Sequence, residues 1–187
     1  MPRDARGGTL GRVRTLLPDP PPAEFEALLE RRRRWGADTH DEVWEGVLHM
    51  SPGPHGRHAM IAQQLAVLLD APARDAGLTP MISAFNLGGR EDYRVPDGGL
   101  LRPGPGALWN PTAALVIEIV SPGDETWDKL GFYAAHHVDE LLIVDPLERS
   151  VQWLARQHGE YTRIERSDLI DLTPAELAGR IDWPPIT

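Results

Sequence analysis

A carboxylate stands inside a long apolar run of this sequence. Residues 113–120 read Ala-Ala-Leu-Val-Ile-Glu-Ile-Val, so Glu118 interrupts an otherwise apolar strand. A run of this kind is typical of a strand that is covered on both faces. Burying a carboxylate is costly unless the group is paired, protonated or bound to a metal. Glu118 therefore needs a buried partner, either a structural one or one that belongs to a functional site, and we favour the functional site.

The candidate partner of Glu118 is Asp97. It lies in a strand predicted over residues 93–101, and a Pro/Gly-rich loop joins this strand to the strand of Glu118. If residue 102 pairs with residue 113, the same antiparallel register places Asp97 opposite Glu118, with Cβ atoms roughly 5 Å apart. Two carboxylates in that position repel each other, and a divalent cation between them removes the conflict. Ligands that are all oxygen favour Mg²⁺ or Mn²⁺ over zinc.

Lys129 is the only lysine among the 19 basic residues of the chain. A lysine kept in such an arginine-rich chain is a candidate for a role that arginine cannot fill, although a single residue is also compatible with chance. Lys129 lies on a helix predicted over residues 125–137, directly after the strand of Glu118. Glu125, four residues earlier, offers an ordinary surface ion pair. The alternative places the ammonium near the carboxylates, where it orients or deprotonates a water. The spacing leaves both alternatives open.

The elements that position these residues form a mixed pattern. From the N-terminal side, apolar spacing and turn residues predict a helix from residue 23, a strand over 43–50 that leads into a turn at 51–54, a helix over 57–69 and a strand over 80–87. After the strands and the helix described above, they predict a strand over 140–145, a hairpin of 151–154 with 161–164, and a short helix from residue 173. This order is neither an alternating doubly wound sheet nor a sandwich. It predicts an α/β (α+β) fold with a mixed central β-sheet flanked by helices.

Length and composition place further limits. The 187 residues suit one domain, and a proline run at residues 18–22 predicts a mobile N-terminal tail over 1–22 ahead of a single domain over 23–187. The absence of cysteine excludes disulfides, thiolate zinc sites and cysteine nucleophiles. No apolar run approaches the length of a membrane-spanning helix, and the N-terminus has no signal-peptide pattern. We therefore expect a cytoplasmic protein that does not associate with membranes.

The net charge of −9 argues against extended electrostatic contact with nucleic acid, although not against a local basic groove. Four arginines are candidates for such a groove beside the two carboxylates: Arg57, Arg90, Arg94 and Arg102. The run Arg31–Arg34 has the side chains to contact phosphates, but we favour its interpretation as a solvated helix end, where positive charge complements the helix dipole.

Several motifs, in order, resemble those of the bacterial family Uma-two, whose members are restriction-endonuclease-like proteins of the PD-(D/E)XK nuclease superfamily. They are Met50-Ser51-Pro52 before a histidine-led helix, Val95-Pro96-Asp97, Glu118-Ile119-Val120-Ser121-Pro122, Lys129 four residues before Tyr133, and Leu142-Ile143-Val144-Asp145-Pro146. The resemblance covers roughly residues 40–165. The superfamily's usual lysine position falls on Val120, whereas Lys129 occupies the lysine position of the Uma-two pattern. The resemblance implies a restriction-endonuclease-like fold.

The resemblance also implies site residues. Asp97 and Glu118 would hold Mg²⁺ or Mn²⁺ with the help of the Ile119 backbone carbonyl, and the metal would polarise a phosphodiester and acidify its bound water. Lys129 would position the attacking water and stabilise charge that develops on the phosphate.

Two further residues enter through the same resemblance. The family's acid-Gly pair is placed at Glu45-Gly46 with a one-residue shift, so Glu45 would add a carboxylate, directly or through water. The family's histidine at the start of the helix falls on His58. Because His58 shares the face of an apolar stripe, it is equally compatible with a half-buried structural histidine.

The resulting hypothesis is a Mg²⁺-dependent endonuclease that hydrolyses DNA phosphodiester bonds, and we expect a homodimer. The alternative is a non-catalytic nuclease fold that serves as an interaction module, which the net charge of −9 favours. The sequence lacks the Gly-x-Ser-x-Gly turn that would carry the nucleophile of a serine triad, and no glycine-rich stretch matches a phosphate-binding loop. The adjacent His136 and His137 point to different helix faces and make poor joint metal ligands. Spacing alone does not exclude a glycosidase carboxylate pair, but nothing else supports it.

Overall fold

The computed structural model describes residues 22–51, 55–121, 123 and 125–185. The chain divides into two compact units, Met1–Asp38 and Thr39–Thr187. Except for residue 22, the tail predicted over residues 1–22 lies outside the described residues, and so do residues 52–54 of the predicted turn. The single domain predicted over residues 23–187 stays a prediction.

The described part of the first unit is built around helix α1 (Ala23–Arg34), which begins at the predicted residue. Its apolar side chains Phe25, Leu28 and Leu29 are half-buried, and no residue of the helix is fully buried. The chain leaves the helix at Trp35, with the four arginines filling the last turn. Positive charge at this end complements the carbonyl groups of the helix terminus, as expected from the sequence.

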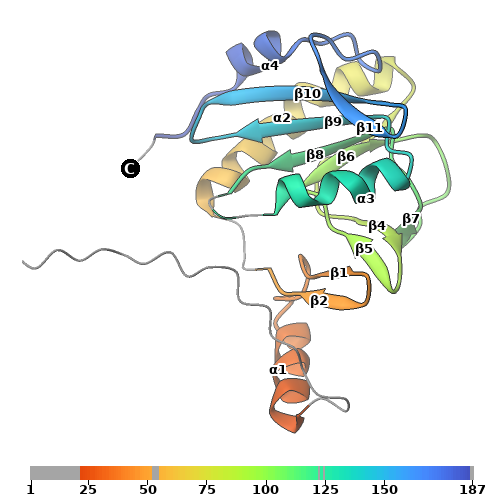
Figure 1. Ribbon diagram of the computed structural model, residues 1–187. Helices are drawn as coiled ribbons and strands as arrows, with labels where there is room; N and C mark the ends of the chain where they lie inside the picture. Colours follow the sequence, from red (N-terminus) through yellow and green to blue (C-terminus); the bar gives the residue numbers. More distant parts are fainter. Residues whose placement is uncertain (1–21, 52–54, 122, 124, 186–187) are drawn as a thin grey trace, which may run out of the picture. The chain divides into compact units, whose positions relative to one another are not determined.

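In the second unit, six strands form a mixed sheet in the order β11-β10-β9-β8-β6-β3 (Figure 1). In that order their bounds are Glu160–Ile164, Ser150–Gln157, Glu140–Asp145, Leu115–Ile119, Gly98–Leu101 and Thr79–Met81. Strands β8 and β9 pair in parallel, and the other neighbours pair antiparallel. Because β8 and β9 are buried along almost their whole length, their sequences read as nearly unbroken apolar runs.

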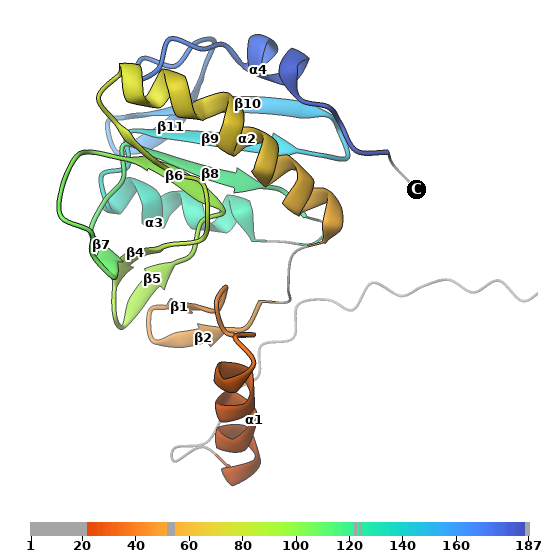
Figure 2. The ribbon, with the colours of Figure 1, turned by 180° about the vertical axis from the view of Figure 1, so that it is seen from behind.

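Helices cover both faces of this sheet. Helix α3 (Leu130–Ala135) lies in front of the sheet in Figure 1, and helix α2 (Gly56–Asp75) lies in front of it in Figure 2. Helix α2 buries Ile61, Leu65 and Leu69 at the predicted spacing against one side of the sheet. Tyr133 of α3 belongs to the core on the other side. Helix α4 (Pro174–Arg180) begins with a capping box and packs against β10.

Five shorter strands form a second sheet in the order β2-β1-β5-β4-β7. In that order their bounds are Val47–His49, Glu42–Trp44, Asp92–Arg94, Asn86–Gly89 and Trp109–Asn110. Strands β4 and β7 pair in parallel, and the others pair antiparallel. Strands β1 and β2 form a hairpin whose two turn residues, Glu45 and Gly46, have φ of 49° and 83°. Positive φ at both residues is the requirement of a tight two-residue hairpin turn.

The predicted mixed α/β class is confirmed, but the strands form two sheets instead of one central sheet. The strand predicted over residues 93–101 is interrupted at Val95-Pro96-Asp97, so that β5 joins one sheet and β6 joins the other. Proline has no N–H to donate to a strand ladder, which explains a break at this position. Likewise, the strand predicted over 80–87 is divided between β3 and β4, and the strand predicted over 43–50 folds into the β1–β2 hairpin.

The predicted register between the two carboxylate strands is confirmed. Gly98 lies opposite Ile117, and Leu100 lies opposite Leu115, as they do when residue 102 is matched with residue 113. Asp97 directly precedes β6, so the same register carries it to the level of Glu118.

Candidate functional site

Glu118 lies in the most deeply buried strand of the six-stranded sheet. All five residues of β8 are buried, and only 5% of the Glu118 surface is exposed. Its Oε1 accepts a hydrogen bond from the Tyr133 hydroxyl, and its two oxygens accept from Lys129 Nζ at 3.2 and 3.4 Å. The buried partners that Glu118 requires are therefore a lysine and a tyrosine of the segment that follows the strand.

Lys129 closes a short 3-10 helix, η1 (Thr126–Lys129), which continues into α3. The single helix predicted over residues 125–137 is thus shorter and has a tighter first turn. The Lys129 ammonium lies 2.9 Å from Glu42 Oε1 and 3.2 Å from Glu118 Oε1, and the Lys129 side chain is 13% exposed. Glu125 instead pairs with His49 at 2.9 Å. The surface ion pair between Glu125 and Lys129 that the spacing allowed is therefore not the arrangement adopted.

Asp97 lies at the break between the two sheets, where its carboxylate bridges β8 and α2. Oδ2 accepts a hydrogen bond from the Ile119 backbone N–H at 2.7 Å, and Oδ1 lies 3.0 Å from His58 Nε2. The side chains of His58 and Asp97 are 13% and 16% exposed. The histidine at the start of α2 therefore contacts one of the predicted site carboxylates instead of packing only against the apolar stripe.

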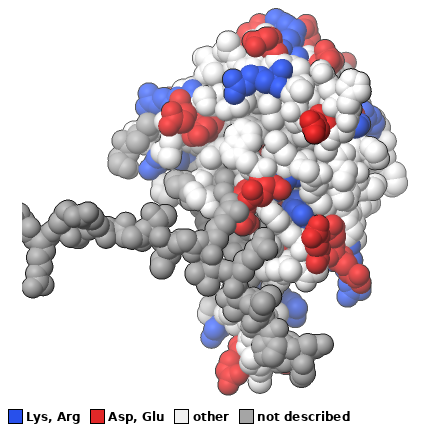
Figure 3. All heavy atoms as spheres, in the orientation of Figure 1, with Lys and Arg blue, Asp and Glu red and all other residues white. Residues whose placement is uncertain are grey.

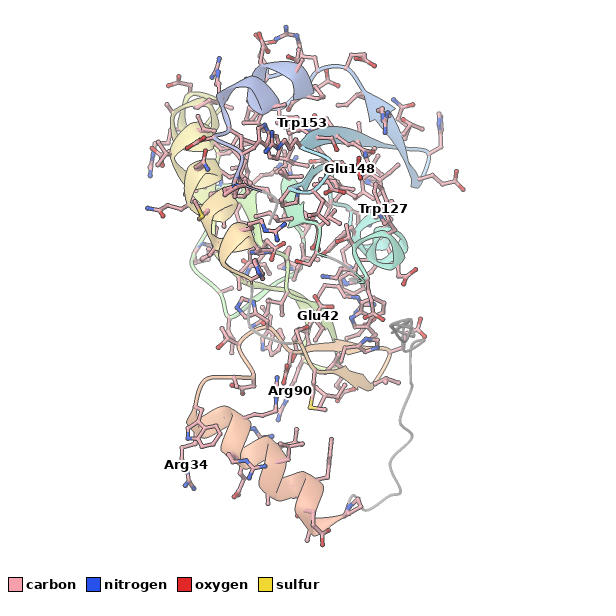
Figure 4. All side chains as sticks on the ribbon, turned by 90° about the vertical axis from the view of Figure 1, so that its left-hand side faces the viewer. Arg34, Glu42, Arg90, Trp127, Glu148 and Trp153 are labelled. Carbon is pink, nitrogen blue, oxygen red and sulfur yellow. The ribbon has the colours of Figure 1, made fainter. Side chains whose placement is uncertain are left out.

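Glu42, on β1, is a site residue that the sequence interpretation missed. Glu42 is labelled in Figure 4, where its side chain projects from the hairpin strand, and the residue is 4% exposed. Its Oε1 accepts from the Val95 N–H at 2.8 Å and pairs with Lys129, and its Oε2 accepts from Trp44 Nε1 at 2.6 Å. The carboxylate thus connects the hairpin, the break before Asp97 and the lysine.

Glu45, which the sequence interpretation placed in the site, lies in the turn of the β1–β2 hairpin. Its side chain is exposed, and its backbone N–H donates to Asp92 Oδ1 at 3.1 Å. The structure does not bring it to the group formed by Glu42, Asp97, Glu118 and Lys129. No local sequence signal distinguishes the neighbouring Glu42, because its place in this group depends on the pairing of β1 with β5.

The site gathers more negative than positive charge. Burial, opposed by the Lys129 ammonium and reinforced by the carboxylates of Asp97 and Glu42, raises the pKa of Glu118 from 4.5 to about 7. Burial also raises the pKa of Tyr133 well above its ordinary value of 10, and the Glu118 carboxylate adds to this effect. Tyr133 therefore remains a hydrogen-bond donor to Glu118 throughout the neutral range.

The electrostatic position of Lys129 determines its protonation. Burial by itself lowers the pKa of a lysine, but here the carboxylates of Glu118 and Glu42 outweigh burial and raise the pKa above the ordinary 10.5. Lys129 is consequently an ammonium at neutral pH. It is suited to stabilise negative charge or to orient a water, and not to accept a proton.

The donor chemistry of the site suits a hard divalent cation. Within the described residues, no group of three or more His, Asp or Glu side chains is arranged as a ready set of metal ligands. Such a set is what a structural zinc site needs, whereas Mg²⁺ keeps several waters and binds through one or two carboxylates. Asp97 and Glu118, which the strand register brings to the same level, would supply those two carboxylates. Burial is the main cause of the raised pKa of Glu118, and the nearby carboxylates of Asp97 and Glu42 add to it, so that a cation would offset both their repulsion and the cost of burial.

Two of the four arginines expected to line a phosphate groove, Arg94 and Arg102, form contacts within the protein. Arg94 is 5% exposed, and its guanidinium lies 4.3 Å from the Trp44 ring centre and 4.0 Å from that of Phe132. It therefore connects the hairpin of Glu42 to α3 and does not line a groove. Arg102 pairs with Asp139. On the face in Figure 3, basic side chains of the second unit are scattered among acidic and uncharged ones instead of forming a band.

Comparisons with known proteins show the family of the chain and a similar fold. A family model named Uma2 and described as "Putative restriction endonuclease" matches residues 22–181. The fold is similar to a crystal structure titled as a putative nuclease belonging to DUF820 from Anabaena variabilis, with a TM-score of 0.61 and 17% identity over 75% of this chain and 90% of that one. No curated protein matches the sequence.

Proposed function

Because this chain belongs to the Uma2 family, whose description is "Putative restriction endonuclease", we propose that it is a Mg²⁺-dependent endonuclease that hydrolyses DNA phosphodiester bonds. The likeness of the fold to that of the Anabaena protein supports a nuclease scaffold. A homodimer and a cytoplasmic location stay predictions. No helix in the described part of the chain is both long and apolar enough to cross a membrane.

The observation that carries the proposal is the position of the Lys129 ammonium between two buried carboxylates. It lies 2.9 Å from Glu42 and 3.2 Å from Glu118, and the Asp97 carboxylate binds the backbone N–H of the next residue of the Glu118 strand. Burying this many charged groups is unfavourable for stability alone, since apolar side chains of similar volume would serve as well or better. Charged groups retained in such a place are typical of a catalytic site.

In this proposal each side chain has a separate task. Asp97 and Glu118 would hold the divalent cation together with the Ile119 carbonyl, and the cation would supply Lewis-acid polarisation of the phosphodiester. Lys129, kept protonated, orients the attacking water and stabilises charge on the phosphate oxygens. Glu42 fixes the ammonium through its ion pair, and His58 fixes one oxygen of Asp97. Tyr133 holds the Glu118 carboxylate in one orientation.

The test is cleavage of supercoiled and linear DNA by the purified protein with Mg²⁺, with Mn²⁺ and with a chelator. We expect cleavage that requires the metal and falls by at least about a hundredfold in Asp97→Asn, which removes a ligand of the cation, and in Lys129→Ala, which removes the ammonium that stabilises charge on the phosphate. Glu160→Gln, which removes one carboxylate from exposed strand β11, is the matched control and should cleave like the wild type. If neither metal supports cleavage of any DNA form, the catalytic proposal fails.

The second candidate function is a nuclease fold that serves only as an interaction module. The observation that favours it is the use of Arg94 and Arg102 within the structure, which removes two of the expected phosphate contacts near the site. This candidate requires that the folded wild-type protein shows no metal-dependent cleavage of DNA. The same assay therefore separates the two functions.

A further inference from the structure

We propose that the arginine-rich end of helix α1, the segment Arg31–Trp35, is a nucleic-acid-binding element that contacts phosphates through arginine and a base through Trp35. This inference rests on the proposed function, because it assumes that the substrate is a polynucleotide. It assigns the contact with the substrate backbone to the first unit of the chain and leaves the chemistry in the second unit.

The charge of the chain is divided unevenly between its two units. Residues 1–38 contain eight arginines and six acidic residues, a net charge of +2, whereas residues 39–187 contain eleven basic and 22 acidic residues, a net charge of −11. A surface of that charge repels a phosphate backbone over a distance of about one Debye length, roughly 8–10 Å at moderate salt. A nuclease built on such a unit needs a separate source of positive charge to retain its substrate.

The segment Arg31–Arg34 is the only place in the sequence where two or more Lys or Arg residues are adjacent. In the structure Arg31, Arg33 and Arg34 are exposed, and the Arg34 side chain extends outward from the end of the helix (Figure 4). Within the described part of the chain, neither Arg33 nor Arg34 forms an ion pair with an acidic side chain. Their charges are therefore available to an external anion.

Trp35 adds a second feature to the same helix end. It is 73% exposed, and it follows the arginines directly. The Arg31 guanidinium lies 6.0 Å from its ring centre. Arginines that contact a backbone beside an exposed aromatic ring are the combination by which proteins bind single strands or frayed ends, with the ring stacking on a base.

A structural role explains the segment less well. Helix-end arginines complement the dipole, but one or two suffice, since the effect is confined to the last turn and is screened by salt. Arg32 already donates to the Ala37 carbonyl at 2.6 Å and so serves the local structure. In the described part of the first unit, the side chains of Arg33 and Arg34 form no comparable contact, and the Arg31 guanidinium lies over the exposed Trp35 ring.

The test is direct binding without cleavage. Fluorescence anisotropy is measured with the full-length protein, a labelled 24-base-pair DNA duplex or the corresponding single strand, a chelator in the buffer, and salt from 50 to 200 mM. The triple variant Arg31→Ala/Arg33→Ala/Arg34→Ala removes the exposed charges and keeps Arg32. The matched control Arg149→Ala/Arg163→Ala/Arg180→Ala removes three exposed charges from the second unit.

We expect the triple variant to bind both DNA forms at least about tenfold more weakly than the wild type. For the duplex, the magnitude of the slope of log affinity against log salt should fall by about 2 to 3, because each lost phosphate contact lowers that magnitude by about 0.9. The matched control should bind within about twofold of the wild type. Trp35→Ala should weaken single-strand binding at least about fivefold and duplex binding less, because stacking needs an unpaired base. Circular dichroism of each variant verifies that the helix content is unchanged.

Equal binding by the triple variant and the wild type overturns the inference, and so does an equal loss in the matched control. A change of oligomeric state in the triple variant, measured by light scattering, with DNA affinity unchanged, overturns it in favour of contact between copies of the chain. The outcome is independent of the proposed chemistry: cleavage with unaltered binding in the triple variant refutes only this inference, whereas arginine-dependent binding without any cleavage refutes only the endonuclease.

Discussion

Replacing Lys129 by methionine removes the ammonium that Glu42 and Glu118 share, and it keeps the length of the apolar stem. The ammonium lies 2.9 and 3.2 Å from the two carboxylates, with 13% of its side chain exposed. Removing one partner of a buried ion pair costs about 3–5 kcal/mol, because the remaining charges stay buried without compensation. For a chain of this size, the loss corresponds to a decrease in melting temperature of roughly 6–20 °C.

The pH dependence of this loss tests its cause. Without Lys129, the folded-state pKa of Glu118 rises further above its ordinary 4.5, because the opposing charge is gone. The destabilisation should therefore be greatest at pH 8, where Glu118 must ionise, and at least about 1 kcal/mol smaller at pH 5, where it stays protonated. The measurement is urea unfolding followed by tryptophan fluorescence at both pH values, in metal-free buffer.

Two further variants isolate the charge pair from the packing. Lys129→Met/Glu118→Gln removes a buried charge of each sign and should recover at least half of the loss, since replacing both partners of a buried pair is far less costly than removing one. Lys129→Arg keeps the charge and should lose less stability than Lys129→Met, while its planar group fits the lysine site poorly and abolishes cleavage. A loss below about 1 kcal/mol in Lys129→Met, or an equal loss at pH 5 and pH 8, would refute the assignment of Lys129 to a buried ion pair.

Five other variants test the remaining contacts. In urea unfolding of the metal-free protein, Glu118→Gln should lose less stability than the wild type as the pH rises from 5 to 8. The reason is that the folded-state pKa of the wild-type carboxyl is raised to about 7, so this group contributes stability below about pH 4.5 that disappears as the pH passes 7. Tyr133→Phe removes the hydroxyl that donates to Glu118 and should lower the free energy of unfolding by about 1–3 kcal/mol, with thermal melting as the measurement. Arg94→Ala should cost about 2–4 kcal/mol in the same assay, because hydrogen bonds to backbone carbonyls and two aromatic contacts are lost; an unchanged melting temperature would show that Arg94 is not structural. In the DNA-cleavage assay, Glu42→Gln should lower the rate at least about tenfold while Glu45→Gln stays within about twofold, and the reverse order would restore Glu45 to the site.

The two carboxylate strands show how far local pattern reaches. The predicted register depended on one assumption, that residue 102 pairs with residue 113 across the Pro/Gly-rich loop, because the two-residue period of a strand then decides which side chains share a face. The pairing of Gly98 with Ile117 agrees with that assumption, and so does the approach of Asp97 to Glu118. The break at Pro96 was visible as a proline inside a strand pattern, but its consequence, a change from one sheet to the other, depends on which strands are available to pair.

The sequence did not predict that Glu42, and not Glu45, lies beside Lys129. Both precede an apolar stretch, and both are acidic, so their spacing does not distinguish them. The distinction arises because β1 pairs with β5, which brings Glu42 to the Val95 N–H and to Lys129, and this pairing joins residues about 50 positions apart. Non-local pairing of this kind is governed by the packing of the whole fold and has no signature within the hairpin itself.

By itself, the sequence determined that Glu118 is buried and needs partners and that the lone lysine follows on the next helix, and with an assumed register it predicted that Asp97 lies opposite Glu118. Each of these conclusions depends on a local rule of burial cost, strand period or chain order. Only the tertiary structure decided that Lys129 turns inward to two carboxylates, that Tyr133 and Glu42 complete the group, and that Arg94 is enclosed by aromatic rings. The physical reason is that a buried charge selects its partners by distance in space, and those distances are set by how α3, the hairpin and the sheet pack together.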